Sequence, residues 1–193
     1  MTSKDSTTVL ETYRILGVDP GTNILGYGII EVKDKSLQLL DLGVLHLREQ
    51  GEQAEKLKLI FEHLQRIIAD FNPKEMAIET PFYGKNIQSM FKLGRAQGVA
   101  IAAAITKGVE VVEYSAKKIK QAVTGNGNAS KEQVAAMLRT ILQKEFGEQY
   151  YDATDAVATA ICHYYQSQSL FGKMKKSKDW TAFIKNNPGR IVK

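Results

Sequence analysis

Four carboxylates occupy positions where a purely structural role is difficult to assign. Asp19 and Glu79 each end a short apolar run, while Asp152 and Asp155 lie three residues apart at the start of an alanine-rich apolar stretch. A carboxylate at the end of a buried segment is costly unless a cation compensates it. We find no buried lysine or arginine in the sequence to match these four acids. Because oxygen-only ligand sets suit Mg²⁺ or Mn²⁺ better than zinc, the pattern predicts a divalent-metal site.

The charge of the chain indicates the substrate of such a site. The formal net charge is +5 and the isoelectric point is about 9.1, which fits a polyanionic partner. Carboxylates from distant segments could hold two cations about 4 Å apart, the spacing that suits in-line phosphoryl displacement. One ion would generate hydroxide from water and the other would stabilise the leaving 3′ oxygen. The sequence therefore predicts metal-assisted cleavage of a phosphodiester.

Taken one at a time, the carboxylates could also have structural roles. Asp19 before Pro20 is typical of an Asx turn, Glu79 could end a surface strand, and Asp152 is a good helix N-cap. Asp155 inside an alanine- and valine-rich helix is harder to explain without a function. Because all four explanations would have to hold together, we favour the metal site.

The elements that must position these acids can be predicted from hydrophobic periodicity and turn residues. Strands are expected at 14–18, 27–32, 37–45, 75–79 and 109–114. Helices are expected at 54–71, 87–106, 115–124, 130–146 and 152–166. Three antiparallel strands followed by strand–helix alternation predict an α/β fold, with a five-stranded mixed sheet and helices on both faces. If the first and fourth strands are neighbours, Asp19 and Glu79 end side by side, and helical spacing places Asp152 and Asp155 on one face.

The chain is expected to form one domain. Residues 1–12 are predicted to be a disordered lead-in, 13–168 the folded domain, and 169–193 a basic tail that is either solvated or a DNA-contacting arm. No apolar run approaches the roughly 20 residues of a membrane span, and the polar N-terminus does not resemble a secretory signal. The single Cys162 predicts a buried thiol in a reducing compartment. These features predict a cytoplasmic location.

Several motifs together carry a family resemblance. They are ILGVDPGT at 15–22, GYG at 26–28, AIE at 77–79, KLGRAQGVA at 92–100 and DATDA at 152–156. In order and spacing they resemble the RuvC family of bacterial Holliday-junction resolvases, and the resemblance covers about residues 13–168.

This resemblance implies a specific activity. It implies a ribonuclease-H-like fold, a homodimer, and symmetric nicking of two like-polarity strands at a four-way DNA junction during recombination and repair. It also implies two Mg²⁺ ions per site, for which Mn²⁺ could substitute, and contact with the branch-migration proteins RuvA and RuvB. Asp19, Glu79, Asp152 and Asp155 match the catalytic metal-binding places of the family.

Candidate DNA contacts are implied by the same resemblance and by the chemistry of the side chains. Phe82 matches an aromatic that stacks on a base near the crossover, an interaction worth about 1–3 kcal/mol, and Tyr83 lies beside it. Lys120 and Lys131 match basic residues near the scissile strand. Other cations that could line a phosphate-binding surface are Lys85, Lys92, Arg95, Lys117 and Lys118. Packed aromatics and a solvated charged face are the alternatives.

The segment 87–106 bears on assembly. Its apolar residues, among them Met90, Phe91 and Ile101, wrap more than one helical face, and Gly94 and Gly98 permit close contact. We expect a two-fold interface, with a fully buried core helix as the alternative.

Two other functions remain open from the sequence. Asp19, Gly21 and Thr22 also resemble the phosphate-binding turn of actin- and hexokinase-like ATPases, which leaves a non-catalytic scaffold of that superfamily possible. A DNA-binding module without catalysis would explain the basic charge but not the four acids. Incubation with branched DNA, with and without Mg²⁺, separates these alternatives from a nuclease.

Overall fold

A computed structural model of the chain describes residues 12–48, 51–81, 86–146 and 151–168, with only the backbone given for Tyr151 and Asp152. Within these ranges no helix is long and apolar enough to cross a membrane.

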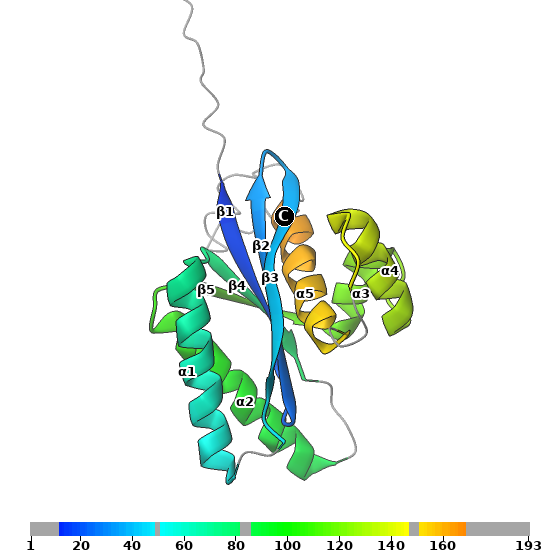
Figure 1. The fold of residues 1–193 in the computed structure, drawn as a ribbon. Helices are drawn as coiled ribbons and strands as arrows, with labels where there is room; N and C mark the ends of the chain where they lie inside the picture. Colours follow the sequence, from blue (N-terminus) through cyan, green and yellow to red (C-terminus); the bar gives the residue numbers. More distant parts are fainter. Residues whose placement is uncertain (1–11, 49–50, 82–85, 147–150, 169–193) are drawn as a thin grey trace, which may run out of the picture.

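The core of the fold is a five-stranded mixed sheet with the strand order β3-β2-β1-β4-β5 (Figure 1). Its strands are β1 (Tyr13–Asp19), β2 (Ile24–Lys33), β3 (Ser36–His46), β4 (Glu75–Thr80) and β5 (Glu110–Ser115). The first three form an antiparallel meander, and β4 and β5 run parallel to β1. The predicted fold class and the central position of the first and fourth strands are therefore confirmed.

The meander is longer than predicted. β2 begins at Ile24, three residues before the expected start, because Ile24 pairs with His46 at the far end of β3. The tight turn between these strands uses Asp34 and Lys35, whose φ angles of 50° and 64° suit a two-residue hairpin.

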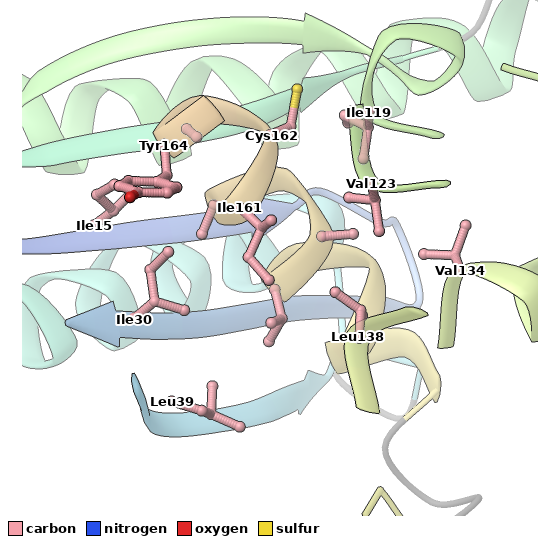
Figure 2. Close-up of a cluster of buried hydrophobic side chains, with 14 of the residues drawn as sticks. Ile15, Ile30, Leu39, Ile119, Val123, Val134, Leu138, Ile161, Cys162 and Tyr164 are labelled. Carbon is pink, nitrogen blue, oxygen red and sulfur yellow. The ribbon is translucent and has the colours of Figure 1, made fainter. Parts of the chain in front are cut away.

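In the described part of the chain, five helices cover the two faces of the sheet (Figure 1). They are α1 (Gln53–Phe71), α2 (Ile87–Ile105), α3 (Ala116–Thr124), α4 (Lys131–Leu142) and α5 (Tyr151–Gln168). One apolar cluster lies under α1 and α2, and a second joins β1 and β2 to α3, α4 and α5. Figure 2 shows the second cluster, in which Ile161 and the free thiol of Cys162 are buried, as predicted for the cysteine.

The predicted end of α4 is wrong. The helix was expected to continue to Phe146 but ends at Leu142, because Gln143 adopts a left-handed φ of 50° and its backbone N–H bonds to the Arg139 carbonyl. Phe146 is nevertheless buried, so its apolar character reflects core packing outside the helix. The helix begins where its sequence favours a start, because Ser130 is a residue type suited to the N-cap position and forms a capping box with Gln133.

Helix α5 packs directly against β1 and β2. A Cβ atom at Gly17 would overlap the carbonyl oxygen of Ala156, and one at Gly28 would lie 2.5 Å from Val157 Cγ2. Ala156 and Ala160 are fully buried. Small residues on both sides thus allow the close approach that brings the start of α5 to the end of β1.

Candidate active site

The parallel pairing of β1 with β4 brings two of the predicted acids together. Val18 is in register with Ile78, so Asp19 and Glu79 follow side by side at the same edge of the sheet. Both line a pocket of about 230 Å³ that α3, α4 and α5 close from one face. Its lining residues are Asp19, Glu79, Ala116, Ile119, Lys120, Lys131, Val134, Asp155 and Ala158.

The electrostatics of this pocket are dominated by Glu79. Burial, followed by the nearby charges of Asp19 and Asp155, raises the pKa of Glu79 from 4.5 to about 8, although Lys131 and Lys120 act in the opposite direction. Without a further cation, the glutamate is therefore mostly protonated at neutral pH. Ionising all three carboxylates in this pocket is costly because their negative charges lie close together. A divalent cation would lower that cost by compensating the charge.

Lysine 131 enters the pocket from the first turn of α4. Its Nζ lies 2.7 Å from Asp155 Oδ2, and the Lys131 side chain is 62% exposed whereas that of Asp155 is 20% exposed. The cation that meets the acids is thus an exposed lysine, whereas the sequence analysis considered only buried lysines and arginines. The sequence could not show this pair, because the two residues lie on different helices and meet only through tertiary packing.

The position of the fourth acid is known only from its backbone. Asp152 lies in the first turn of α5, three residues before Asp155, and its side chain is outside the described set. Among the side chains that are described, no three potential ligands are grouped closely enough to hold a metal ion by themselves. The structure thus brings Asp19, Glu79 and Asp155 to one pocket, and the all-oxygen donor set fits Mg²⁺ or Mn²⁺ in chemistry.

The predicted cations on α3 divide between two sides of the helix. Lys120 lines the carboxylate pocket, and Lys117, one turn earlier, lines an adjoining hollow with Lys120, Pro81 and Gly127. Lys118 faces elsewhere, with its Nζ 5.2 Å from the centroid of the Tyr114 ring. The structure therefore brings Lys117 and Lys120 to the site but not Lys118.

The remaining predicted residues lie on α2 or outside the described residues. Lys92 and Arg95 are exposed on α2, and Arg95 borders an apolar hollow of about 410 Å³ formed with Ile87, Met90, Phe91 and Gly94. Phe82, Tyr83 and Lys85 fall in the segment 82–85, which the structure does not describe.

A polar network behind the site was not predicted from the sequence. His163 shows no metal-ligand spacing in the sequence, which predicts a structural or an exposed residue; it is structural, because it is buried, with Nδ1 2.8 Å from Tyr114 Oη and Nε2 2.8 Å from Glu75 Oε2. This network ties α5 to β4 and β5, the elements that carry or flank the acids. The sequence feature that could have indicated this network is a histidine two turns after Asp155 on the same apolar helix.

Comparison with known proteins agrees with this geometry. The sequence model of the family described as crossover junction endodeoxyribonuclease RuvC matches residues 15–163. A Cytophaga hutchinsonii protein of that name is 54% identical over 99% of this chain and 94% of its own, and one from Christiangramia forsetii is 48% identical over 99% and 100%.

Solved structures show the same fold. Thermus thermophilus RuvC superposes with a TM-score of 0.73 at 31% identity, covering 80% of this chain and 95% of the other. The same protein in complex with a Holliday junction substrate gives a TM-score of 0.72 at 28% identity, with the same coverage. From the full-length similarity and the matched sheet, we conclude that this chain belongs to the RuvC family of crossover junction endodeoxyribonucleases.

Proposed function

We propose that this protein is a crossover junction endodeoxyribonuclease that resolves four-way DNA junctions by symmetric nicks in two strands of like polarity. The single observation that carries this proposal is the convergence of Asp19, Glu79 and Asp155 on one pocket within the family-matched region. The junction-bound Thermus relative supports the substrate. Neither alternative, a non-catalytic scaffold of the actin-like superfamily or a DNA-binding module without catalysis, would need clustered acids.

The carboxylates are proposed to hold two Mg²⁺ ions, with Mn²⁺ as a substitute. Asp19, Glu79 and Asp155 would contribute from the described pocket, and Asp152 from the first turn of α5. When bound, such ions activate water and stabilise the leaving 3′ oxygen. Glu79 must lose its proton to serve as a ligand, and Lys131 competes with any cation for Asp155.

The surface around the pocket supports DNA binding. Lys117, Lys120 and Lys131 place positive charge beside the acids, where they would contact phosphates of the cleaved strand. Lys92 and Arg95 would extend this surface along α2, whereas Lys118 contributes least because its ammonium group lies over Tyr114. Phe82, with Tyr83 and Lys85 beside it, directly follows the strand that carries Glu79 and would stack on an unpaired base.

The exposed face of α2 supports a homodimer. Ile87 and Phe91 are 67% and 66% exposed, and a Cβ atom added at Gly94 or Gly98 would meet no described atom within 4 Å. The alternative of a fully buried core helix is therefore wrong. A two-fold contact along this face of α2 would bury its exposed apolar residues and supply the two active sites that paired nicks require.

Further parts of the proposal concern the setting of the reaction. DNA as substrate places the protein in the cytoplasm of a bacterium, with RuvA and RuvB as proposed partners. We retain the division into a nuclease domain at 13–168, a lead-in at 1–12 and a basic tail at 169–193 that could contact DNA.

The decisive experiment is cleavage of a mobile four-way junction with both nicks mapped. We expect Mg²⁺-dependent paired nicks from the parent protein, while Asp19→Asn retains junction binding and loses cleavage. Binding without Mg²⁺-dependent nicking by the parent would favour the DNA-binding module, and ATP hydrolysis would favour the scaffold superfamily. Cleavage by Asp19→Asn near the parent rate would remove Asp19 from the site.

A further inference from the structure

A second polar hollow lies at the same edge of the sheet as the carboxylate pocket. Its volume is about 590 Å³, and it is lined by Asn23, Ile24, His46 and Arg48. These residues come from the start of β2 and the end of β3, which in Figure 1 extend beyond the first turn of α5. No sequence motif pointed to this hollow.

Strand register places His46 on the same face of the sheet as Asp19. Asp19 pairs with Gly26, Gly26 pairs with Val44, and directly paired residues share a face. His46 lies two residues beyond Val44, so it returns to that face. Two strand spacings and two residues of rise separate the Cα atoms of Asp19 and His46 by roughly 12 Å.

Because side chains alternate between the two faces of a strand, the residue after His46 points into the core. Leu47 is fully buried in the cluster under α1 and α2, and its backbone N–H donates to the Asn23 carbonyl at 2.7 Å. Residues on either side of Leu47 therefore project away from that core. His46 and Arg48 are both exposed and line the hollow together.

The charge of this hollow is not compensated by described neighbours. Within the described ranges, neither the His46 ring nor the Arg48 guanidinium has an ion pair or hydrogen-bond partner. The next acids in the sequence that the structure describes are Glu52 and Glu55, and their side chains form the capping box of α1. This exposed arginine is therefore available to pair with an external anion such as a DNA phosphate.

We propose that His46 and Arg48 form a second phosphate-contact surface, which binds the backbone of the DNA arm leaving the carboxylate pocket across β2 and β3. The proposal rests on the nuclease function above. A separation of roughly 12 Å spans three or four phosphates of one strand along a duplex axis, so one arm reaches both sites. The surface fixes the direction of that arm without touching the reacting atoms.

The test measures junction affinity of the full-length protein in EDTA at several salt concentrations. We expect Arg48→Ala to weaken binding about fivefold to tenfold and to lower the slope of log K against log salt by about one. His46→Ala with Arg48→Ala should weaken binding further, and Arg48→Lys should restore the slope. The control is Arg66→Ala, an exposed arginine on α1, which covers the opposite face.

Cleavage separates this proposal from the function on which it rests. Arg48→Ala should still nick at the parent positions, because Arg48 does not line the carboxylate pocket, but it should need a higher protein concentration for half-maximal cleavage, whereas Arg66→Ala should cleave as the parent does. If Arg48→Ala and the double variant match the parent in affinity and slope, the surface is overturned even when the parent cuts junctions normally. If the parent binds junctions without cutting them, the nuclease function fails, and the affinities still decide whether this surface contacts DNA.

Discussion

Substitution of Glu79 by glutamine should change stability in a manner that depends on pH. Burial, together with Asp19 and Asp155, raises the pKa of this carboxyl group from 4.5 to about 8 in the folded protein. The glutamine variant keeps the shape and polarity of the side chain but cannot acquire the unfavourable charge. Comparison of the two proteins therefore isolates the cost of ionising Glu79 in the pocket.

The sign and size of the effect follow from proton linkage. Because the folded state binds the proton more tightly than the unfolded state, the contribution of Glu79 to stability is fully present below pH 4.5. It is lost as the pH rises, and the loss is complete above about pH 8. The shift sets a ceiling of about 5 kcal/mol, and we expect about 2 to 3 kcal/mol because solvent reaches part of this half-buried group.

The assay is urea unfolding in EDTA at pH 5, 7 and 9. Parent and Glu79→Gln should have nearly equal free energies of unfolding at pH 5, and the variant should be more stable at pH 9. Mg²⁺ should stabilise the parent more at pH 9 than at pH 6, since protons and cations compete for the same carboxylates. The control is Glu110→Gln, an exposed glutamate at the start of β5, at the opposite edge of the sheet.

Parallel stability curves for parent and Glu79→Gln across this pH range would refute the reasoning. Such a result would mean that neither burial nor the neighbouring acids raise the cost of ionising Glu79. The case for a strained carboxylate cluster, and for the cation that would relieve it, would then lose its electrostatic support.

Three further perturbations test other parts of the structure. Lys131→Met should lower the Mg²⁺ concentration needed for half-maximal cleavage about threefold while weakening junction binding, because it frees Asp155 but removes a DNA-facing cation; an unchanged metal requirement would argue against competition. Phe91→Asp should convert the proposed dimer to a monomer in sedimentation velocity, because it places a charge on the exposed apolar face of α2; an unchanged mass would exclude this face as the interface. Tyr114→Phe should cost about 1–2 kcal/mol in urea unfolding by leaving His163 Nδ1 without its partner, and no loss would show that the network is not stabilising.

Much of the fold could be predicted from the sequence because its information is local. Apolar periodicity and turn residues specified the order of strands and helices, and Ser130 marked the start of α4 through its capping chemistry. The same patterns placed Asp19 and Glu79 at neighbouring strand ends. Errors occurred where local chemistry was ambiguous, as at Gln143, whose left-handed backbone ends α4 four residues earlier than its apolar pattern suggested.

The sequence by itself determined which residue types are available and which element carries each of them. Only the tertiary structure decided that Lys131 meets Asp155, that Glu79 resists ionisation, and that His46 shares a face with Asp19. The physical reason is that pairing, desolvation and strand register depend on distances between segments far apart in the chain. Periodicity specifies which way a residue faces within its own element, whereas packing specifies what that residue meets.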